Sequence, residues 1–177
     1  MSKLCAIVIG HKKKSPGACN KNQNLYEFEF NDDLALRIER KVKDTDIQRV
    51  YRRTYILLPD DINALKPDFI ISLHCNAFNA TVSGTEVLYY YKSPKGEEMA
   101  RILLEHLVEF LELPERGVKP KTAEDRGGYL LRYTHKPCVI AEPFFIDNDQ
   151  DLVKAQADME GLASAYANAI DEVSRII

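Results

Sequence analysis

Short apolar runs alternate with longer amphipathic segments along almost the whole chain, and this alternation constrains the fold more than any other feature. Strands are predicted at residues 4–9, 46–51, 68–73, 84–91 and 137–141, and helices at residues 27–43, 96–113 and 149–176. Residues 59–65 predict a turn or short helix, and residues 115–132 predict loops around a short strand. Strands alternating with helices predict an α/β fold with a mostly parallel or mixed central sheet flanked by helices.

The length and net charge of the chain limit the number of domains and the classes of partner. A chain of 177 residues is long enough for one packed domain, so we expect a single domain over residues 1–177 and favour a monomer. The net charge of -3 argues against nucleic acid as a main partner. The sequence has no apolar stretch near the roughly 20 residues that span a bilayer, which predicts no integral membrane segment.

The four cysteines are scattered along the chain without a CxxC pair. This spacing argues against a zinc finger and against a disulfide framework. Cys5 and Cys138 fall inside apolar runs and are expected to be buried thiols. Cys19 and Cys75 lie near candidate metal ligands, so an accessory ligand role stays open for them.

Polar side chains follow three of the predicted strands at the point where each strand ends. These are His11, His74 and Glu142, and a further carboxylate, Glu27, opens the first long helix. Carboxyl ends of parallel strands gather ligand sites at one edge of a sheet. Two imidazoles and one carboxylate around zinc leave a coordination position open, which is typical of catalytic rather than structural sites. Glu142 is then the candidate acid/base.

Each of these residues also has an interpretation without a metal. His11 can be a polar loop residue, and His74 a hydrogen-bonded histidine at the edge of the core. Glu27 can favour the dipole of its own helix, which is compatible with metal binding as well. Glu142 can be a paired structural acid. The spacing contains no HExxH, so the residues alone leave both interpretations open.

A set of ordered motifs points to one family. They are GH at residues 10–11, Glu27 with the helix after it, SLHCNA at 72–77, GTEV at 84–87 and PCVIAEPFFIDN at 137–148. Together they resemble the zinc-dependent N-acetylmuramoyl-L-alanine amidase family of the amidase_3 type, over nearly the whole chain. The resemblance implies a phosphorylase/hydrolase-like α/β fold, in which His11, Glu27 and His74 bind one zinc ion and Glu142 is catalytic.

The resemblance also implies a substrate. Members hydrolyse the amide bond between N-acetylmuramic acid and L-alanine in bacterial peptidoglycan, so the expected partners are the stem peptide and the glycan strand. Asn76, Arg116 and Arg132 lie in segments that resemble the lining of the peptide groove. Two alternatives remain: a zinc carboxypeptidase acting on stem peptides, and a non-catalytic wall-binding domain.

The biological setting expected from this pattern is a phage or prophage endolysin. The first residues lack the features of a secretory signal, and no repeat suggests a separate wall-binding domain. We therefore expect synthesis in the cytoplasm, release to the cell wall through a holin, and degradation of the wall that lyses the host.

Overall fold

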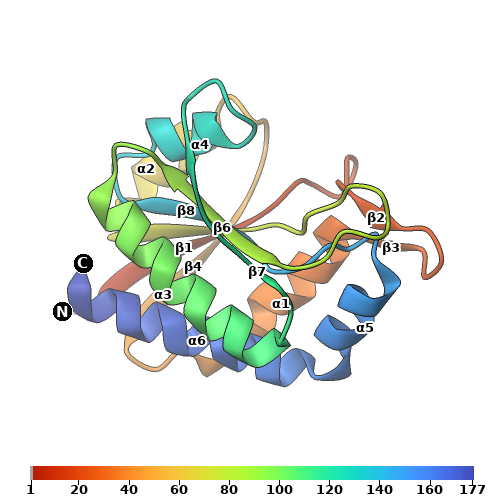
Figure 1. The fold of residues 1–177 in the computed structure, drawn as a ribbon. Coiled ribbons are helices and arrows are strands. Elements are labelled where there is room, and N and C mark those ends of the chain that lie inside the picture. Colours follow the sequence, from red (N-terminus) through yellow and green to blue (C-terminus); the bar gives the residue numbers. More distant parts are fainter. Residues whose placement is uncertain (1) are drawn as a thin grey trace.

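The computed structural model describes residues 2–177 as one mixed sheet with helices on both faces (Figure 1). The strands are β1 (Lys3–Ile9), β2 (Cys19–Asn20), β3 (Leu25–Tyr26), β4 (Thr45–Tyr51), β5 (Phe69–Leu73), β6 (Thr85–Tyr90), β7 (Glu115–Lys121) and β8 (Cys138–Glu142). The helices are α1 (Glu27–Lys41), α2 (Leu58–Leu65), α3 (Pro94–Leu111), α4 (Gly128–Tyr133), α5 (Asp149–Ala157) and α6 (Met159–Ile176).

The direction of the strands decides at which edge of the sheet the candidate site residues lie. The six-stranded sheet has the order β4-β1-β5-β8-β6-β7. The first four strands are parallel, β6 runs antiparallel to β8, and β7 is parallel to β6. The predicted mixed α/β sheet is confirmed. The carboxyl ends of β1, β5 and β8 therefore share one edge. The start of β6 lies at the same edge, because β6 is antiparallel to β8 and Glu86 pairs with Glu142.

The two faces of the sheet bury different side chains because successive residues of a strand point to opposite sides. On β1, Ile7 packs into the larger core with α1, α3 and α6, whereas Ala6 and Val8 pack into a smaller core with α2 and α4. Figure 1 shows α3 and α6 crossing below the sheet and α2 and α4 above it. The side with the smaller helices is the one that leaves room for a cleft.

Some predicted elements differ from the structure. The helix predicted over residues 149–176 is two helices, α5 and α6, broken at Asp158, whose side chain accepts a hydrogen bond from Gly161 N at 2.7 Å. Asp158 thus caps a new helix instead of continuing the old one. Residues 115–132 contain not only a strand but also the start of α4, and the short pair β2–β3 was not predicted.

Among residues 2–177, the helices are all too short or too polar to cross a bilayer.

Candidate metal centre and cleft

The two histidines are placed by the ends of neighbouring parallel strands. His11 follows β1 in the left-handed conformation, with φ of 66°, and His74 follows β5 directly. Gly10 N donates to Leu73 O at 2.9 Å, and His74 N donates to Ala141 O at 3.0 Å. Backbone hydrogen bonds therefore tie the ends of β1, β5 and β8 together and fix both imidazoles at the same edge.

Glu27 reaches the histidines from the first turn of α1. Its backbone N–H donates to Ala18 O at 2.9 Å and that of Phe28 donates to Pro16 O at 2.9 Å. The loop before the helix thus satisfies amides that otherwise have no partner at a helix start. The Glu27 side chain is only 1% exposed, so its position is set by the surrounding protein rather than by solvent.

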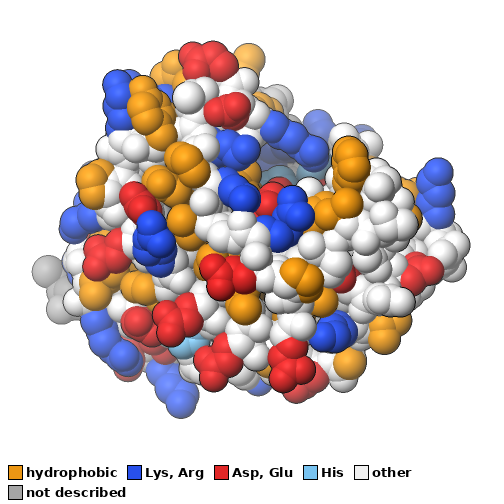
Figure 2. Space-filling view, in the orientation of Figure 1, with side chains coloured by type: hydrophobic (Ala, Val, Ile, Leu, Met, Phe, Trp, Pro, Cys, Tyr) orange, Lys and Arg blue, Asp and Glu red, His pale blue; other side chains and the backbone are white. Residues whose placement is uncertain are grey.

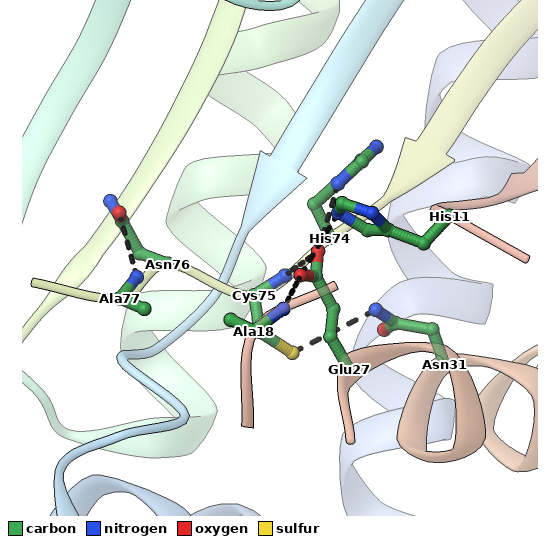
Figure 3. A network of polar contacts seen from close by, with 8 residues as sticks. All are labelled: His11, Ala18, Glu27, Asn31, His74, Cys75, Asn76 and Ala77. Atoms are coloured by element: carbon green, nitrogen blue, oxygen red, sulfur yellow. Dashed lines mark hydrogen bonds and ion pairs between the residues drawn. The ribbon is translucent and has the colours of Figure 1, made fainter. Parts of the chain in front are cut away.

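The three side chains converge on one another (Figure 3). His74 Nδ1 lies 2.8 Å from Glu27 Oε1, and His11 Nε2 lies 3.0 Å from Glu27 Oε2. One ligand atom from each of the three residues lies within 4.8 Å of the others. Backbone amides hold the carboxylate from behind, because Cys75 N donates to Oε1 and Ala18 N donates to Oε2, each at 3.0 Å.

These donor atoms fit a metal ion. His11 Nε2 is shielded from solvent and lies close to Glu27 without the geometry of a hydrogen bond, which leaves a buried nitrogen without a partner. Burial alone raises the pKa of Glu27, but the approach of the His11 and His74 imidazoles outweighs it and holds the pKa well below its usual range. Glu27 is therefore an anion, and two imidazoles with one carboxylate form the donor set of an open zinc site.

Neither cysteine near the histidines belongs to this cluster, as far as residues 2–177 are concerned. Cys75 Sγ accepts a hydrogen bond from Asn31 Nδ2 at 3.7 Å and packs in the larger core. Burial, followed by the charges of Glu27 and Glu142, raises the pKa of the Cys75 thiol well above its usual value. It is a buried neutral thiol rather than a metal ligand.

Glu142 ends β8 beside the metal cluster, and its Oε2 atom is shielded from solvent without a hydrogen-bond partner. Burial, with the charges of Glu27 and Glu86 adding to it, raises the pKa of Glu142 to about 8, although Arg126 and Lys121 act in the opposite direction. A carboxyl group whose pKa lies near neutrality can both take up and release a proton.

A cleft of about 610 Å³ opens from the histidines over the face of the sheet that carries α2 and α4. Figure 2 shows Lys and Arg side chains around a hollow in which a histidine is visible. The cleft is lined by His11, His74 and Glu142, and also by Glu86, Lys121 and Arg126, which the sequence analysis did not select. Their signal was weak, since a basic loop and a carboxylate in a strand are common on protein surfaces.

The three residues predicted to contact substrate differ in their position relative to the cleft. Asn76 lines the cleft, and its Nδ2 donates to Glu86 Oε1 at 2.8 Å. Arg116 Nε donates to Glu86 Oε2 at 2.9 Å, so it adjoins the cleft through that carboxylate. Arg132 does not line the cleft, and its guanidinium sits over Tyr90 and Tyr133, 5.5 Å from each ring centroid.

The mixed sheet, the His–Glu–His cluster at its edge and a second carboxylate beside it define an α/β protein with a site able to hold a metal ion. Residues 5–172 match the model of the N-acetylmuramoyl-L-alanine amidase family Amidase_3, so the chain belongs to that family. It is an enzyme of the class that hydrolyses an amide bond of peptidoglycan.

Two proteins of Bacillus subtilis are similar in sequence to this chain over most of its length. The chain is 28% identical to the uncharacterised protein YqiI of Bacillus subtilis over 96% of its own length and 84% of that protein. It is 27% identical to the amidase LytC of the same organism, but it spans only 34% of LytC.

Solved structures show the same fold. An amidase from Clostridium difficile 630 superimposes with a TM-score of 0.83 at 22% identity, covering 96% of this chain and 95% of that one. The catalytic domain of the CD27L endolysin, which targets Clostridium difficile, gives a TM-score of 0.79 at 27% identity and covers 96% of this chain and 97% of its own.

Proposed function

We propose that the protein is a zinc-dependent amidase that cleaves the bond between N-acetylmuramic acid and L-alanine, with His11, Glu27 and His74 holding the zinc ion. The observation that carries this proposal is the convergence of three donor atoms within 4.8 Å at the base of a cleft. Zinc bound there supplies a Lewis acid that polarises the amide carbonyl and acidifies water.

The protein's own residues supply the rest of the reaction. Glu142 lies at the same edge of the sheet, and its shielded Oε2 has no competing hydrogen bond. We assign it the transfer of a proton from the attacking water to the leaving L-alanine nitrogen. Proton transfer by a positioned side chain contributes about 10² to 10⁴ in rate, so Glu142→Gln is expected to lower kcat by that factor.

The test is digestion of purified cell walls, with mass spectrometry of the products and zinc analysis of each variant. The wild type is expected to release stem peptides with L-alanine at the new N-terminus, and a chelator is expected to stop the release. Glu142→Gln should keep zinc and lose activity, whereas His74→Ala should lose both. His106→Ala is the matched control, because that histidine pairs with Glu172 on the surface and lies outside the cluster.

Four results would contradict the assignment. Full activity of Glu142→Gln would remove that residue from the reaction, and activity insensitive to the chelator would remove zinc. Cleavage inside the stem peptide would favour the alternative peptidase, and zinc-loaded protein that binds walls without cleaving them would favour a binding domain.

We also propose an endolysin setting, in which the enzyme is made in the cytoplasm and reaches the wall through a holin. The similarity to the catalytic domain of the CD27L endolysin supports it. Expression in a bacterium with susceptible walls tests this: lysis is expected only when a holin is expressed as well. Lysis without a holin would show that the enzyme leaves the cell by another route.

A further inference from the structure

Three cationic side chains line the cleft beyond the metal cluster. They are Arg52, from the segment after β4, Lys121, at the end of β7, and Arg126, from the loop before α4. Among residues 2–177, none of the three forms an ion pair with a carboxylate, whereas Arg37, Arg49 and several other basic residues on the surface do. The three cationic groups of the cleft are therefore free of direct ion pairs among the described residues.

The loop that carries Arg126 is fixed by its own hydrogen bonds. Asp125 Oδ2 accepts from Thr122 N at 2.7 Å and from Thr122 Oγ1 at 2.9 Å, and Gly128 N donates to Asp125 O at 2.8 Å. Gly127 has a φ of 83°, and a Cβ there would lie 2.7 Å from Ile140 Cδ1. The loop thus packs closely on the sheet, which limits the backbone freedom at Arg126.

The segment that carries Arg52 is joined to α4, the helix that follows the Arg126 loop. The Arg52 guanidinium lies 5.7 Å from the centroid of the Tyr55 ring, and the Tyr55 and Tyr129 rings are 5.6 Å apart. The Tyr129 hydroxyl donates to Ile56 O at 3.2 Å, which connects α4 to the segment before α2. The segment before α2 and the helix α4 are therefore held together. A site that is ordered in this way loses less entropy when it binds a ligand.

Four carboxyl groups also line the cleft, Glu86, Glu124, Asp125 and Glu142. None of them forms an ion pair with the three cations, although Lys121 interacts electrostatically with Asp125 and Glu142. Glu86 accepts hydrogen bonds from Arg116 and Asn76, and Asp125 accepts hydrogen bonds from Thr122. Glu124 is exposed, and Glu142 ends β8 beside the metal cluster. The floor adds a fully buried hydroxyl, Ser72 Oγ, that has no hydrogen-bond partner.

We propose that Arg52, Lys121 and Arg126 form a carboxylate-binding subsite for the stem peptide. The inference rests on the proposed function, because it assumes that the stem peptide occupies the cleft. The residue after L-alanine in a stem peptide carries either a free α-carboxylate or its amide. Cationic donors of this kind bind the carboxylate through charge-assisted hydrogen bonds, which the neutral amide cannot match. The subsite thus makes the enzyme selective for stem peptides that are not amidated at this position.

Two synthetic muramoyl peptides that differ only in this group, carboxylate or carboxamide, test the proposal. For the zinc-loaded wild type we expect kcat/KM to be roughly 10-fold higher on the carboxylate peptide, mainly through KM. In Arg126→Gln and in Lys121→Gln the ratio of the two kcat/KM values should fall toward 1, and Arg126→Lys should restore part of it. Lys119→Gln is the matched control, because it removes one charge from the same strand outside the cleft lining.

A ratio near 1 in the wild type, or a ratio that Arg126→Gln and Lys121→Gln both leave unchanged, would overturn the subsite while leaving the amidase intact. Hydrolysis of neither peptide would instead count against the proposed function. In that case calorimetry with the free stem peptides still decides, since the subsite requires tighter binding of the carboxylate form by the wild type than by Arg126→Gln. Circular dichroism and zinc content check that each variant is folded and loaded.

Discussion

At the scale of single residues, one glycine packs against the metal cluster. Gly17 has a φ of 84°, and a Cβ there would lie 2.5 Å from Glu27 Oε2 and 2.6 Å from His11 Cδ2. Two proposed ligands therefore occupy the space that any other side chain at this position needs. The cluster depends on a residue that itself offers no donor atom.

Gly17→Ala is accordingly expected to weaken zinc binding at least about 10-fold, besides the roughly 1 kcal/mol that alanine costs in a left-handed conformation. Gly117→Ala separates the two effects, because Gly117 also has a φ of 84° but a Cβ there would meet nothing within 4 Å. Competition with a chromophoric chelator measures the zinc affinity. Equal affinities in the two variants would show that the packing at Gly17 is unimportant for the metal.

The raised pKa of Glu142 predicts a pH dependence of stability when zinc has been removed by a chelator. The pKa is about 8 in the folded protein against an ordinary value of 4.5. Between these values the folded state retains a proton that the unfolded state has lost, so the free energy of unfolding falls as the pH rises through this window. The full loss, reached above pH 8, is roughly 2 to 5 kcal/mol.

Urea denaturation at several pH values, compared between the wild type and Glu142→Gln, measures this contribution. The glutamine cannot ionise, so the variant should lack this part of the pH dependence while sharing that of every other group. Parallel curves for the two proteins would mean that the Glu142 carboxyl is solvated and titrates near its ordinary pKa.

At the scale of elements, α5 holds together two segments that lead to the cleft. Asp151 is 1% exposed, and its Oδ2 accepts from Gly84 N at 3.2 Å and from Phe145 N at 3.1 Å. Its Oδ1 accepts from Ser83 Oγ at 2.5 Å. The start of β6, which carries Glu86, and the chain just after Glu142 are therefore anchored on one buried carboxylate.

Asp151→Ala would leave these buried donors without a partner, and we expect it to lower the free energy of unfolding by about 2 to 4 kcal/mol. Denaturant unfolding of the zinc-loaded protein measures the change. Gln150→Ala, in the same helical turn but exposed, should stay within about 0.5 kcal/mol of the wild type. A similar small change for Asp151→Ala would show that water replaces the lost carboxylate.

At the scale of the whole molecule, the metal cluster links segments that are distant in sequence. His11 follows β1, Glu27 begins α1 and His74 follows β5, so an ion bound to all three would link two strands of the sheet to α1. A ligand that binds only the folded state stabilises it in proportion to the logarithm of its free concentration. Stability should therefore depend on zinc.

With free zinc a thousandfold above its dissociation constant, the free energy of unfolding should rise by about 4 kcal/mol. Thermal unfolding in zinc buffers measures the rise, and His74→Ala should abolish most of it. His106→Ala should retain it. A gain in His74→Ala equal to that of the wild type would place the stabilising zinc elsewhere.

Much of the site could be read in the sequence because its residues stand next to strong local signals. His11 and His74 end apolar runs, Glu27 begins an amphipathic helix, and Glu142 follows another run, so each was selected without knowing the fold. Glu86 and Arg126 have no such signal. Glu86 faces the cleft because β6 runs antiparallel to β8, a fact of sheet topology, and Arg126 faces it because the loop before α4 folds back on the sheet.

The sequence by itself determined the alternation of strands and helices and the motifs that identify the family, because both depend on the order of residues over short distances. Tertiary structure decided the break at Asp158, the position of Arg132 outside the cleft, and the gathering of cations without ion pairs in the cleft that holds the metal cluster. Those features depend on strand order and on contacts between distant segments. Local periodicity does not encode such contacts, since the same apolar pattern is compatible with either direction of a strand.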